Sequence, residues 1–250
     1  MRPMKALAGG CAVIPHDRVY QSEGTRSFRV PISEEMGARQ MLQTISLYAS
    51  GRAPSRRNPF AEEVLYVVGG FGVCRIDDFA YPLRPGMGVY IPPRSIYQIR
   101  NTQENPLEIV SVACPEDRKV YVGFSLPKLS RSTPPKRTVL EETQEAVTAR
   151  TRTFTELAGR EQGCALVTQF IGVIPPGRAS MHSHPYEEAI YILEGKGHLK
   201  TDEGDAGFST GTSIYLSRGV SHCLENDSAA SIRLLGVFHP AAPPAYRYEE

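Results

Sequence analysis

The sequence lacks any apolar run long enough to cross a lipid bilayer. Its longest runs, such as Glu63 to Val68 and Ala189 to Leu193, fall far short of the roughly twenty residues that a membrane-spanning helix requires. Near the N-terminus, Arg2 and Lys5 precede a brief Ala-Leu-Ala-Gly-Gly-Cys stretch, which superficially resembles a lipoprotein signal but has no long apolar segment. We therefore predict no membrane partner, and a disordered leader at this end.

The sequence also lacks an excess of charge of either sign. Lys and Arg total 28, Asp and Glu total 27, and the formal net charge is +1. Such a balance provides no general field that would attract phosphate polymers or anionic membranes, and no helix-turn-helix segment or basic recognition helix is evident. With 41% hydrophobic and 22% charged residues, the composition is that of a globular protein. We predict no nucleic-acid partner.

Paired cysteine motifs are missing as well. The five cysteines are an odd number, and none are spaced as a CxxC pair, so neither a disulfide framework nor a cysteine zinc site is indicated. Each is best interpreted as a small buried apolar residue, and a reducing, cytoplasmic location fits them best. The five are Cys11, Cys74, Cys114, Cys164 and Cys223.

What the sequence does contain is an internal repeat with a constant spacing of 125 positions. The matches fall on acidic residues, strand tyrosines and turn glycines. A shared register of this length indicates a duplicated structural unit. The matched pairs are Glu63 and Glu188, Tyr66 and Tyr191, Gly70 and Gly195, Gly72 and Gly197, Asp77 and Asp202, Gly86 and Gly211, Tyr90 and Tyr215, and Asn101 and Asn226.

The duplication predicts two tandem domains, each of a size usual for a single domain. We place the first domain over residues 1–125 and the second over residues 151–250. Residues 126–150 between them hold Pro127, Pro134 and Pro135 and no apolar periodicity, which favours an extended, solvated linker. Within it, Glu141 to Arg150 is predicted to form a short surface helix.

Each copy is predicted to be all-β. Short segments rich in Val, Ile, Leu and Tyr are interrupted by Gly and Pro about every ten residues, a pattern typical of many short strands in a barrel or jelly roll. Glycines in Gly69 to Gly72 and Glu194 to Gly197 suit tight hairpins. The clearest strands are Val64–Val68, Gly88–Ile91, Leu107–Ala113, Leu166–Ile174, Ala189–Leu193, Ser213–Leu216 and Ile232–Phe238.

Four side chains of the second copy have metal-ligand character: His182, His184, Glu188 and His222. Because side chains two apart on a strand share a face, both His182 and His184 would point into the barrel. Glu188 joins them if Pro185 to Glu187 form a bend, and His222 would approach from a later strand. We predict that these four residues bind one metal ion.

The donor set indicates the kind of metal. Three imidazoles and one carboxylate suit a divalent transition metal, namely iron, manganese, nickel, copper, cobalt or zinc, whereas calcium and magnesium prefer mostly oxygen ligands. Such a site leaves one or two coordination positions open for substrate or water. The alternative for the four residues is a second barrel without metal. His16, His198 and His239 are interpreted as ordinary surface or core residues.

These residues and their spacing resemble the two motifs of the cupin superfamily. Ser217 stands where the second motif usually has proline, a departure that affects the turn more than the chemistry. Together with the repeat, the motifs indicate a bicupin, a chain of two tandem cupin-type jelly-roll barrels. The first motif matches Gly177, His182, His184, Glu188 and Gly195, and the second matches Gly219, His222 and Asn226.

The first copy departs from the motifs at the histidines. At the spacing of 125, Arg57, Pro59 and Tyr97 stand at the histidine positions, and only Glu63 keeps a ligand type; a one-residue gap that aligns Asn58 with His184 restores no histidine. Neither proline nor guanidinium ligates a metal in this way. We predict a metal-free first barrel with a structural role, or a vestigial pocket in which Arg57, Tyr97 and Glu63 hold an anion.

Several residues near the site in sequence are not expected to take part in catalysis. We predict that Glu187 points away from Glu188 into solvent, and that strand alternation turns Cys223 away from the face used by His222. Arg178, Tyr186 and Tyr191 are given no catalytic role, and no catalytic residue is assigned.

The resemblance implies a range of functions, because cupins include dioxygenases, isomerases, decarboxylases, lyases and hydrolases as well as non-catalytic sugar-binding and storage proteins. We expect a metal-dependent enzyme acting on a small oxygenated or carboxylate substrate, in the first instance a mononuclear dioxygenase-type oxidoreductase with iron or manganese. The alternatives are a hydrolase, isomerase or lyase with the architecture of ureidoglycine aminohydrolases, or a non-catalytic protein that binds a sugar or acid. Barrel edges favour a homodimer.

Overall fold

A computed structural model describes residues 5–6, 10–16, 20–115, 120–149, 151–178 and 180–241. Regular structure in this part of the chain is almost entirely β-strand, with three 3-10 turns, η2 (Glu34–Met36), η3 (Glu141–Thr143) and η4 (Arg160–Gln162). The described residues contain no helix that is long and apolar enough to span a membrane. The all-β prediction is therefore confirmed.

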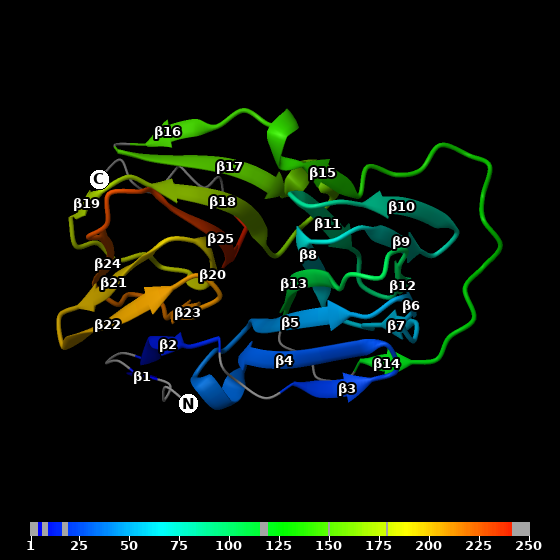
Figure 1. Ribbon diagram of the computed structural model, residues 1–250, viewed down its shortest axis with the longest axis horizontal. Coiled ribbons are helices and arrows are strands. Elements are labelled where there is room, and N and C mark those ends of the chain that lie inside the picture. The colour runs from blue at the N-terminus through cyan, green and yellow to red at the C-terminus, as the bar shows by residue number, and fades with distance from the viewer. Residues whose placement is uncertain are drawn as a thin grey trace.

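Two sheets build the first jelly-roll barrel, on the right in Figure 1. One sheet has the order β15 (Thr138–Leu140), β11 (Met87–Ile91), β8 (Glu62–Gly69), β13 (Leu107–Cys114), β5 (Leu42–Tyr48), β4 (Arg26–Ile32) and β3 (Gln21–Glu23). The other has the order β10 (Phe79–Leu83), β9 (Gly72–Ile76), β12 (Ile96–Asn101), β7 (Arg56–Arg57) and β14 (Tyr121–Val122), with β6 (Gly51–Arg52) beside β12.

The second barrel repeats this arrangement on the left in Figure 1. Its larger sheet has the order β1 (Lys5–Ala6), β2 (Ala12–Ile14), β23 (Ser213–Leu216), β20 (Glu187–Glu194), β25 (Ile232–His239), β18 (Thr168–Ile174), β17 (Arg152–Ala158) and β16 (Val147–Ala149). Its smaller sheet has the order β19 (Gly177–Arg178), β24 (His222–Asn226), β21 (Lys196–Thr201) and β22 (Gly204–Ser209).

The predicted strands are present, and the turn glycines between them have a structural reason. Each of the seven predicted segments lies within an observed strand except for Leu166 and Val167, which precede β18. Gly70 and Gly195 have φ values of +83° and +95°, which side chains other than glycine rarely adopt. A Cβ at Gly70 would lie 2.8 Å from the Cα of Leu107, so only glycine allows this close approach.

The two barrels exchange edge strands. Strand β2 pairs with β23 of the second barrel, and β15 pairs with β11 of the first, as Figure 1 shows for the blue and green segments. Each exchanged strand covers a sheet edge that would otherwise expose unpaired backbone groups. The predicted disordered leader, Arg2 to Cys11, lies mostly outside the described residues; it is wrong at Lys5 and Ala6, which form β1, and at Cys11, which is buried.

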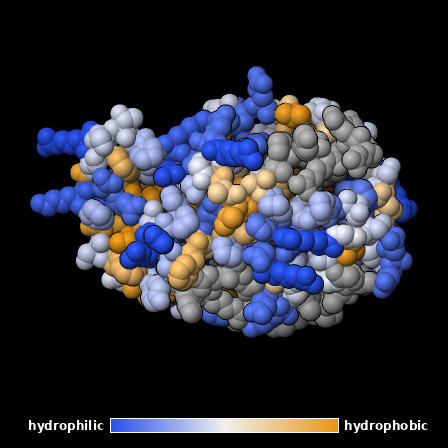
Figure 2. Space-filling model, turned by 180° about the vertical axis from the view of Figure 1, so that it is seen from behind, coloured by the Kyte–Doolittle hydropathy of each residue, from blue (hydrophilic) through white to orange (hydrophobic). Residues whose placement is uncertain are grey.

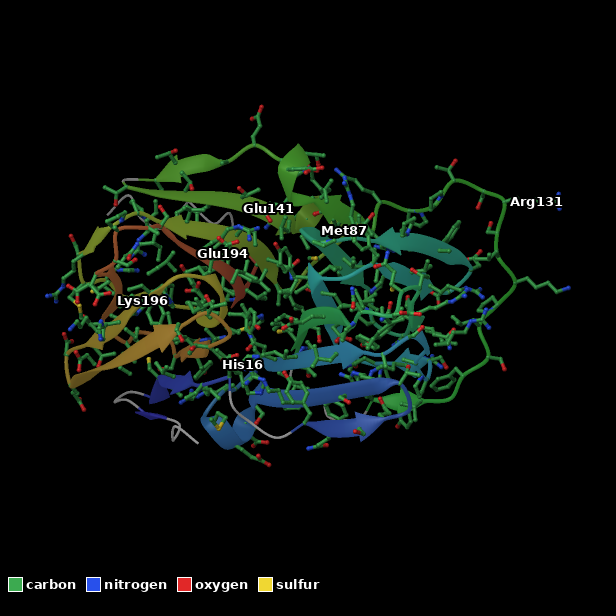
Figure 3. The ribbon with its side chains drawn as sticks, in the orientation of Figure 1. His16, Met87, Arg131, Glu141, Glu194 and Lys196 are labelled. Atoms are coloured by element: carbon green, nitrogen blue, oxygen red, sulfur yellow. The ribbon has the colours of Figure 1, made fainter. Side chains whose placement is uncertain are left out.

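The predicted linker, residues 126–150, has an irregular first part and a second part with regular structure. Residues 123–137 run without regular structure around the outer side of the first barrel, and Figure 3 places Arg131 at its tip. Residues 138–149 form β15, η3 and β16, so the predicted surface helix is wrong over its described residues beyond Thr143. Val139 is buried, which shows that this short segment supplies apolar packing despite its polar composition.

Two buried carboxylates hold the barrels together reciprocally. Glu62 of the first barrel accepts hydrogen bonds from the backbone N–H groups of Ala165, Leu166 and Val167 at 3.0, 2.6 and 2.9 Å. Glu187 of the second barrel accepts them from Arg39 and Gln40 at 3.0 and 3.2 Å. Glu62 and Glu187 are 125 positions apart, so the contacts repeat the duplication.

The prediction that Glu187 is solvated is therefore wrong. Its side chain is 1% exposed, and the hydroxyl of Tyr215 donates a further hydrogen bond to it at 3.0 Å. It does point away from Glu188, as strand alternation requires, but the far side of its strand faces the first barrel rather than solvent.

A charged cluster also joins the barrels. Arg233 of β25 pairs with Glu141 of η3 and lies 3.6 Å from Glu194, and Tyr66 of β8 donates to Glu141 at 2.9 Å. Figure 3 labels both glutamates, which share Arg233 as a partner. The segment after the linker is thus fixed to both barrels.

The outer surface is mixed in character. Figure 2 shows hydrophobic side chains in small groups among hydrophilic ones on the back of the molecule. Large hydrophobic side chains with substantial exposure are Phe60, Phe71, Tyr121, Val122, Leu129 and Val147.

Candidate metal centre

The structure brings the four predicted ligands together inside the second barrel. His182 and His222 face each other across an antiparallel bridge, with N···O distances of 3.0 and 2.8 Å. His184 follows two residues after His182, and its carbonyl accepts the N–H of Gly219 at 2.8 Å. Glu188 projects from β20, and its Oε2 lies 3.3 Å from Nε2 of His184.

The ring positions describe a compact group. The centroid of the His222 ring lies 4.7 Å from that of His182 and 4.8 Å from that of His184, while His182 and His184 are 6.5 Å apart. The set is looser than a closed coordination shell, and among the described residues no three His, Cys, Asp or Glu side chains meet that stricter geometry.

Backbone carbonyls fix the orientation of each imidazole. Nδ1 of His182, His184 and His222 lies 3.1, 2.8 and 2.8 Å from the carbonyl oxygens of Ser180, Tyr186 and Val220, respectively. A carbonyl oxygen only accepts hydrogen bonds, so Nδ1 carries the proton and the lone pair is on Nε2. All three rings therefore present their Nε2 atoms for ligation, the arrangement typical of metal-binding histidines.

Burial lowers the pKa of two of these imidazoles, His182 and His222. His184, Glu188 and His222 are 4%, 6% and 2% exposed. Desolvation, reinforced by the neighbouring His184, lowers the pKa of His222 to about 4, and desolvation also lowers the pKa of His182. Because only neutral imidazole binds a metal, the environment favours the ligating form at neutral pH.

His184 supplies the observation that tests the fit of a metal. Its Nε2 is buried without a hydrogen-bond partner. The Tyr186 ring stacks on the His184 ring, with the ring centroids 3.9 Å apart and an interplanar angle of 1°. An unsatisfied buried nitrogen is costly unless it gains a ligand. The donor atoms present, three Nε2 and one carboxylate, fit a divalent transition metal.

A narrow cavity of about 20 Å³ opens beside His182, Glu188 and His222. Its wall is mainly apolar and includes Phe154 and Phe170, whose ring centroids are 5.6 Å apart. His222 and Leu224 line it, whereas the intervening Cys223 does not, so the prediction for Cys223 is confirmed. An apolar wall excludes water and strengthens electrostatic interactions inside the cavity.

Sequence reasoning missed one cavity residue, Arg152. It begins β17, is 8% exposed and lines the cavity together with His182, Glu188 and His222. The signal was present in the repeat: Arg152-Thr153-Phe154 matches Arg26-Ser27-Phe28 at a spacing of 126 rather than 125. Searching at one fixed spacing hid this match.

The first barrel shows where the spacing changes. Arg56 pairs with Tyr97 as His182 pairs with His222, and the Asn58 carbonyl accepts the N–H of Arg94 as that of His184 accepts Gly219. The true counterparts of His182 and His184 are therefore Arg56 and Asn58, and the extra residue lies in the loop before Glu62. The alignment of Arg57 and Pro59 with the histidines is corrected accordingly.

None of these counterparts is available to a metal. The Asn58 side chain accepts hydrogen bonds from the N–H groups of Phe60 and Ala61 at 3.0 and 2.8 Å. Tyr97 donates to Glu63 at 2.9 Å, and Arg56 pairs with Glu23 at 2.7 Å. A permanently charged guanidinium at the His182 position repels a cation, which supports the prediction of a metal-free first barrel.

The fold and the site together define a class of protein, a tandem jelly-roll chain with a histidine-rich pocket in one barrel. A family model described as "Cupin domain" matches this chain twice, over residues 44–113 and 170–238. The chain belongs to the cupin family, as the resemblance of its motifs implied, and its two matches make it a bicupin.

Solved structures with the same fold are similar along almost the whole chain. YlbA of E. coli has a TM-score of 0.74 at 16% identity, covering 94% of this chain and 93% of its own. A putative glyoxylate induced protein of Pseudomonas aeruginosa has a TM-score of 0.74 at 20% identity, covering 94% and 91%. Oxalate decarboxylase of Bacillus subtilis has a TM-score of 0.74 at 15% identity, covering 90% and 74%. At these identities the likeness shows the fold alone.

A curated relative is more limited in extent. An uncharacterised protein of Methanocaldococcus jannaschii, MJ1618, is 25% identical over 79 residues, which is 32% of this chain and 63% of that protein. The match thus covers about a third of this chain and less than two thirds of that protein.

Proposed function

We propose that this chain is a metal-dependent bicupin enzyme that acts on a small oxygenated or carboxylate substrate, with dioxygenase-type oxidation as its reaction class. The observation that carries this proposal is the convergence of His182, His184, Glu188 and His222 beside an apolar cavity, with the three Nδ1 atoms bonded to backbone carbonyls. That arrangement prepares four donor atoms for one ion and leaves room for a small ligand next to them.

The four residues would hold a divalent transition metal, which when bound would supply a Lewis acid and, if iron or manganese, redox capacity. The three imidazoles bind through Nε2, and Glu188 contributes negative charge. Tyr186 keeps the His184 ring in one plane by stacking on it. Phe154 and Phe170 exclude bulk water from the reacting groups.

The lining favours oxidation over hydrolysis. Among the described cavity residues the ionisable side chains are Arg152, His182, Glu188 and His222. Three of these are the proposed ligands and the fourth is an arginine, which remains protonated. No further carboxylate or imidazole of the lining is free to act as the general base that hydrolysis requires. The names of the fold relatives, which include an oxalate decarboxylase, make decarboxylation of a small acid the second candidate.

The first experiment measures metal content. Elemental analysis of freshly purified protein is expected to give about one equivalent per chain, with iron or manganese predominating. In H182A/H184A the metal should be lost, because two of the three imidazoles are removed. The matched control is H198A, which removes an imidazole from the partly exposed pair with Asp227 and should retain the metal. Full metal content in H182A/H184A would refute the ligand assignment.

The second experiment separates the reaction classes. The metal-loaded protein is incubated with two- to five-carbon oxo, hydroxy and dicarboxylic acids while oxygen uptake and carbon dioxide release are recorded. Substrate-dependent oxygen uptake supports the oxygenase, and carbon dioxide release without net oxygen uptake supports the decarboxylase. Binding without turnover of any acid would contradict an enzymatic role.

A homodimer and a cytoplasmic location are further parts of this proposal. The edge strands β3, β10 and β16 lie at the ends of their sheets, and burial of such edges between two copies favours a dimer. Light scattering of the purified chain is expected to give twice the mass of one chain, and a mass of one chain would contradict it.

A further inference from the structure

We infer that Arg152 is a substrate-binding residue that takes a carboxylate of the substrate within the metal cavity. This inference rests on the proposed function and narrows its substrate class to small carboxylic acids. Arg152 is 8% exposed and lines the cavity together with Phe154 and the proposed ligand His182.

The guanidinium of Arg152 is incompletely satisfied. Its Nη2 donates to the carbonyl oxygen of Leu224 at 3.3 Å, whereas its Nε is buried without a hydrogen-bond partner. Among the ion pairs of the described residues, none involves Arg152, although Arg26, Arg56 and Arg233 each have a carboxylate. A buried charge without a counterion is costly, so the cavity favours the entry of an anion.

The first barrel shows what completes such a site. Arg26, the counterpart of Arg152, also begins the strand β4, and Nη1 of Arg26 lies 3.3 Å from Oε2 of Glu23. In β3 and β4, Glu23 is directly opposite Arg26; in β16 and β17, Ala149 is directly opposite Arg152. The duplicated chain thus has a built-in carboxylate in one barrel and a methyl group in its place in the other.

The same comparison indicates where a ligand carboxylate would lie. Glu23 in the first barrel bridges Arg26 and Arg56, at 3.3 and 2.7 Å, and Arg56 occupies the position that His182 has in the second barrel. A carboxylate bound to Arg152 in the corresponding place would lie between the guanidinium and the His182 side of the metal site. The rest of a bound acid would then be directed toward the four proposed ligands.

Aromatic residues limit the size of that acid. Phe170 of the second barrel replaces Thr44 of the first, and Gly236 opposite it replaces Ser111. The larger Phe170 side chain helps to leave only a narrow cavity, about 20 Å³, beside the ligands. We therefore assign the smallest carboxylic acids, with few polar groups beyond the carboxylate that Arg152 binds.

The test uses the metal-loaded full chain and calorimetric titration with oxalate, malonate and succinate, and with the corresponding diamides as neutral probes. The variants are R152Q, which removes the charge, and A149E, which installs the carboxylate that the first barrel already has. Their matched control is A149Q, which has nearly the same size but no charge. Metal content is measured on each sample, so that a failure of the proposed metal site is seen separately from a failure of this inference.

We expect at least one of the acids to bind the wild type and the diamides to bind far more weakly. R152Q and A149E should each weaken the binding of the acid by about 10- to 100-fold, the loss of one charge-assisted pair, with metal content unchanged. A149Q should weaken it much less than A149E. The inference is overturned if none of the acids binds the wild type, if R152Q and A149E bind it as tightly as the wild type, or if A149Q weakens it as much as A149E.

Discussion

At the scale of single residues, the histidine site depends on hydrogen bonds that are made by the backbone. Each Nδ1 is bonded to a carbonyl two residues away, Ser180 for His182, Tyr186 for His184 and Val220 for His222. The same local geometry therefore selects the tautomer protonated on Nδ1 in all three histidines. No side chain outside these loops is needed to orient the rings.

A second residue-scale feature is the complementary size of Phe170 and Gly236, which are opposite each other on neighbouring strands. A Cβ at Gly236 would lie 2.2 Å from Cζ of Phe170, so the ring fits only because its neighbour across the strands has no side chain. The first barrel has Thr44 and Ser111 at these places, where a smaller side chain allows a larger neighbour.

This pair makes a stability prediction for G236A. The added methyl forces the Phe170 ring into the cavity or displaces β25, and overpacking of this kind costs about 1–3 kcal/mol. Urea unfolding followed by circular dichroism measures the change in the free energy of unfolding. The control is G207A, at an exposed strand glycine whose Cβ would make only ordinary contacts, with His198 at 3.5 Å and the Gly197 carbonyl oxygen at 3.9 Å, and it should change the free energy by less than about 0.5 kcal/mol. Equal stability of G236A and wild type would contradict the packing argument.

At the scale of elements, the exchanged strands β2 and β15 decide how the barrels close. Each is only three residues long, yet each pairs with a strand of the other half, β23 and β11 respectively. A segment this short is not stable as a strand by itself; it forms here because it gains a sheet edge and apolar contacts together. The repeat unit therefore begins at the exchanged strand rather than after the linker.

The contribution of β2 can be measured at Ile14. Its side chain is completely buried among residues of both barrels, so I14A is expected to lower the free energy of unfolding by about 2–4 kcal/mol. V147A is the matched control, because Val147 lies in the edge strand β16 and is 53% exposed; it should cost less than about 0.5 kcal/mol. A small effect of I14A would show that this end of the chain is dispensable for the fold.

At the scale of the whole molecule, the two barrels form one structure through reciprocal contacts. Glu62 and Glu187 each leave their own barrel to accept backbone N–H groups of the other, and a tyrosine, Tyr90 or Tyr215, donates to each. Burial and the nearby carboxylate raise the pKa of both tyrosines above the ordinary value, so each hydroxyl remains a donor at neutral pH. Apolar contacts between the barrels, including Ile14, Val64 and Ala189, surround these bonds.

Changing the two carboxylates should destabilise the contact between the barrels, so that the barrels no longer unfold together. E187Q replaces the carboxylate by a neutral amide, which weakens the charge-assisted hydrogen bonds from the N–H groups of Arg39 and Gln40 and removes the ion pair with Arg218, and it is expected to cost about 1–3 kcal/mol. E62Q should act similarly, and the double variant should broaden the thermal transition into two steps in calorimetry. E145Q, at an exposed position, is the control and should leave one transition. A single sharp transition in the double variant would show that apolar contacts alone couple the barrels.

The sequence predicted much of this arrangement because its signals were local. Strand alternation, turn glycines and the spacing of His182, His184, Glu188 and His222 depend on neighbours within one repeat, and the structure brings these four side chains together. Glu187, Arg152 and Ala12 to Ile14 were missed for a common reason. Each contacts a segment more than fifty residues away: Arg39 and Gln40 for Glu187, Leu224 for Arg152, and β23 for Ala12 to Ile14. In addition, one extra loop residue shifts the register of the repeat.

By itself, the sequence determined an all-β chain, its duplication and the donor types of one barrel, because periodicity and residue chemistry act along the chain. Only the tertiary structure decided that Glu187 is buried, that the ends of the two halves exchange strands, and that Arg152 faces the histidines without a carboxylate of its own. These outcomes depend on which surfaces meet when the two barrels pack, and packing joins positions that no local pattern relates.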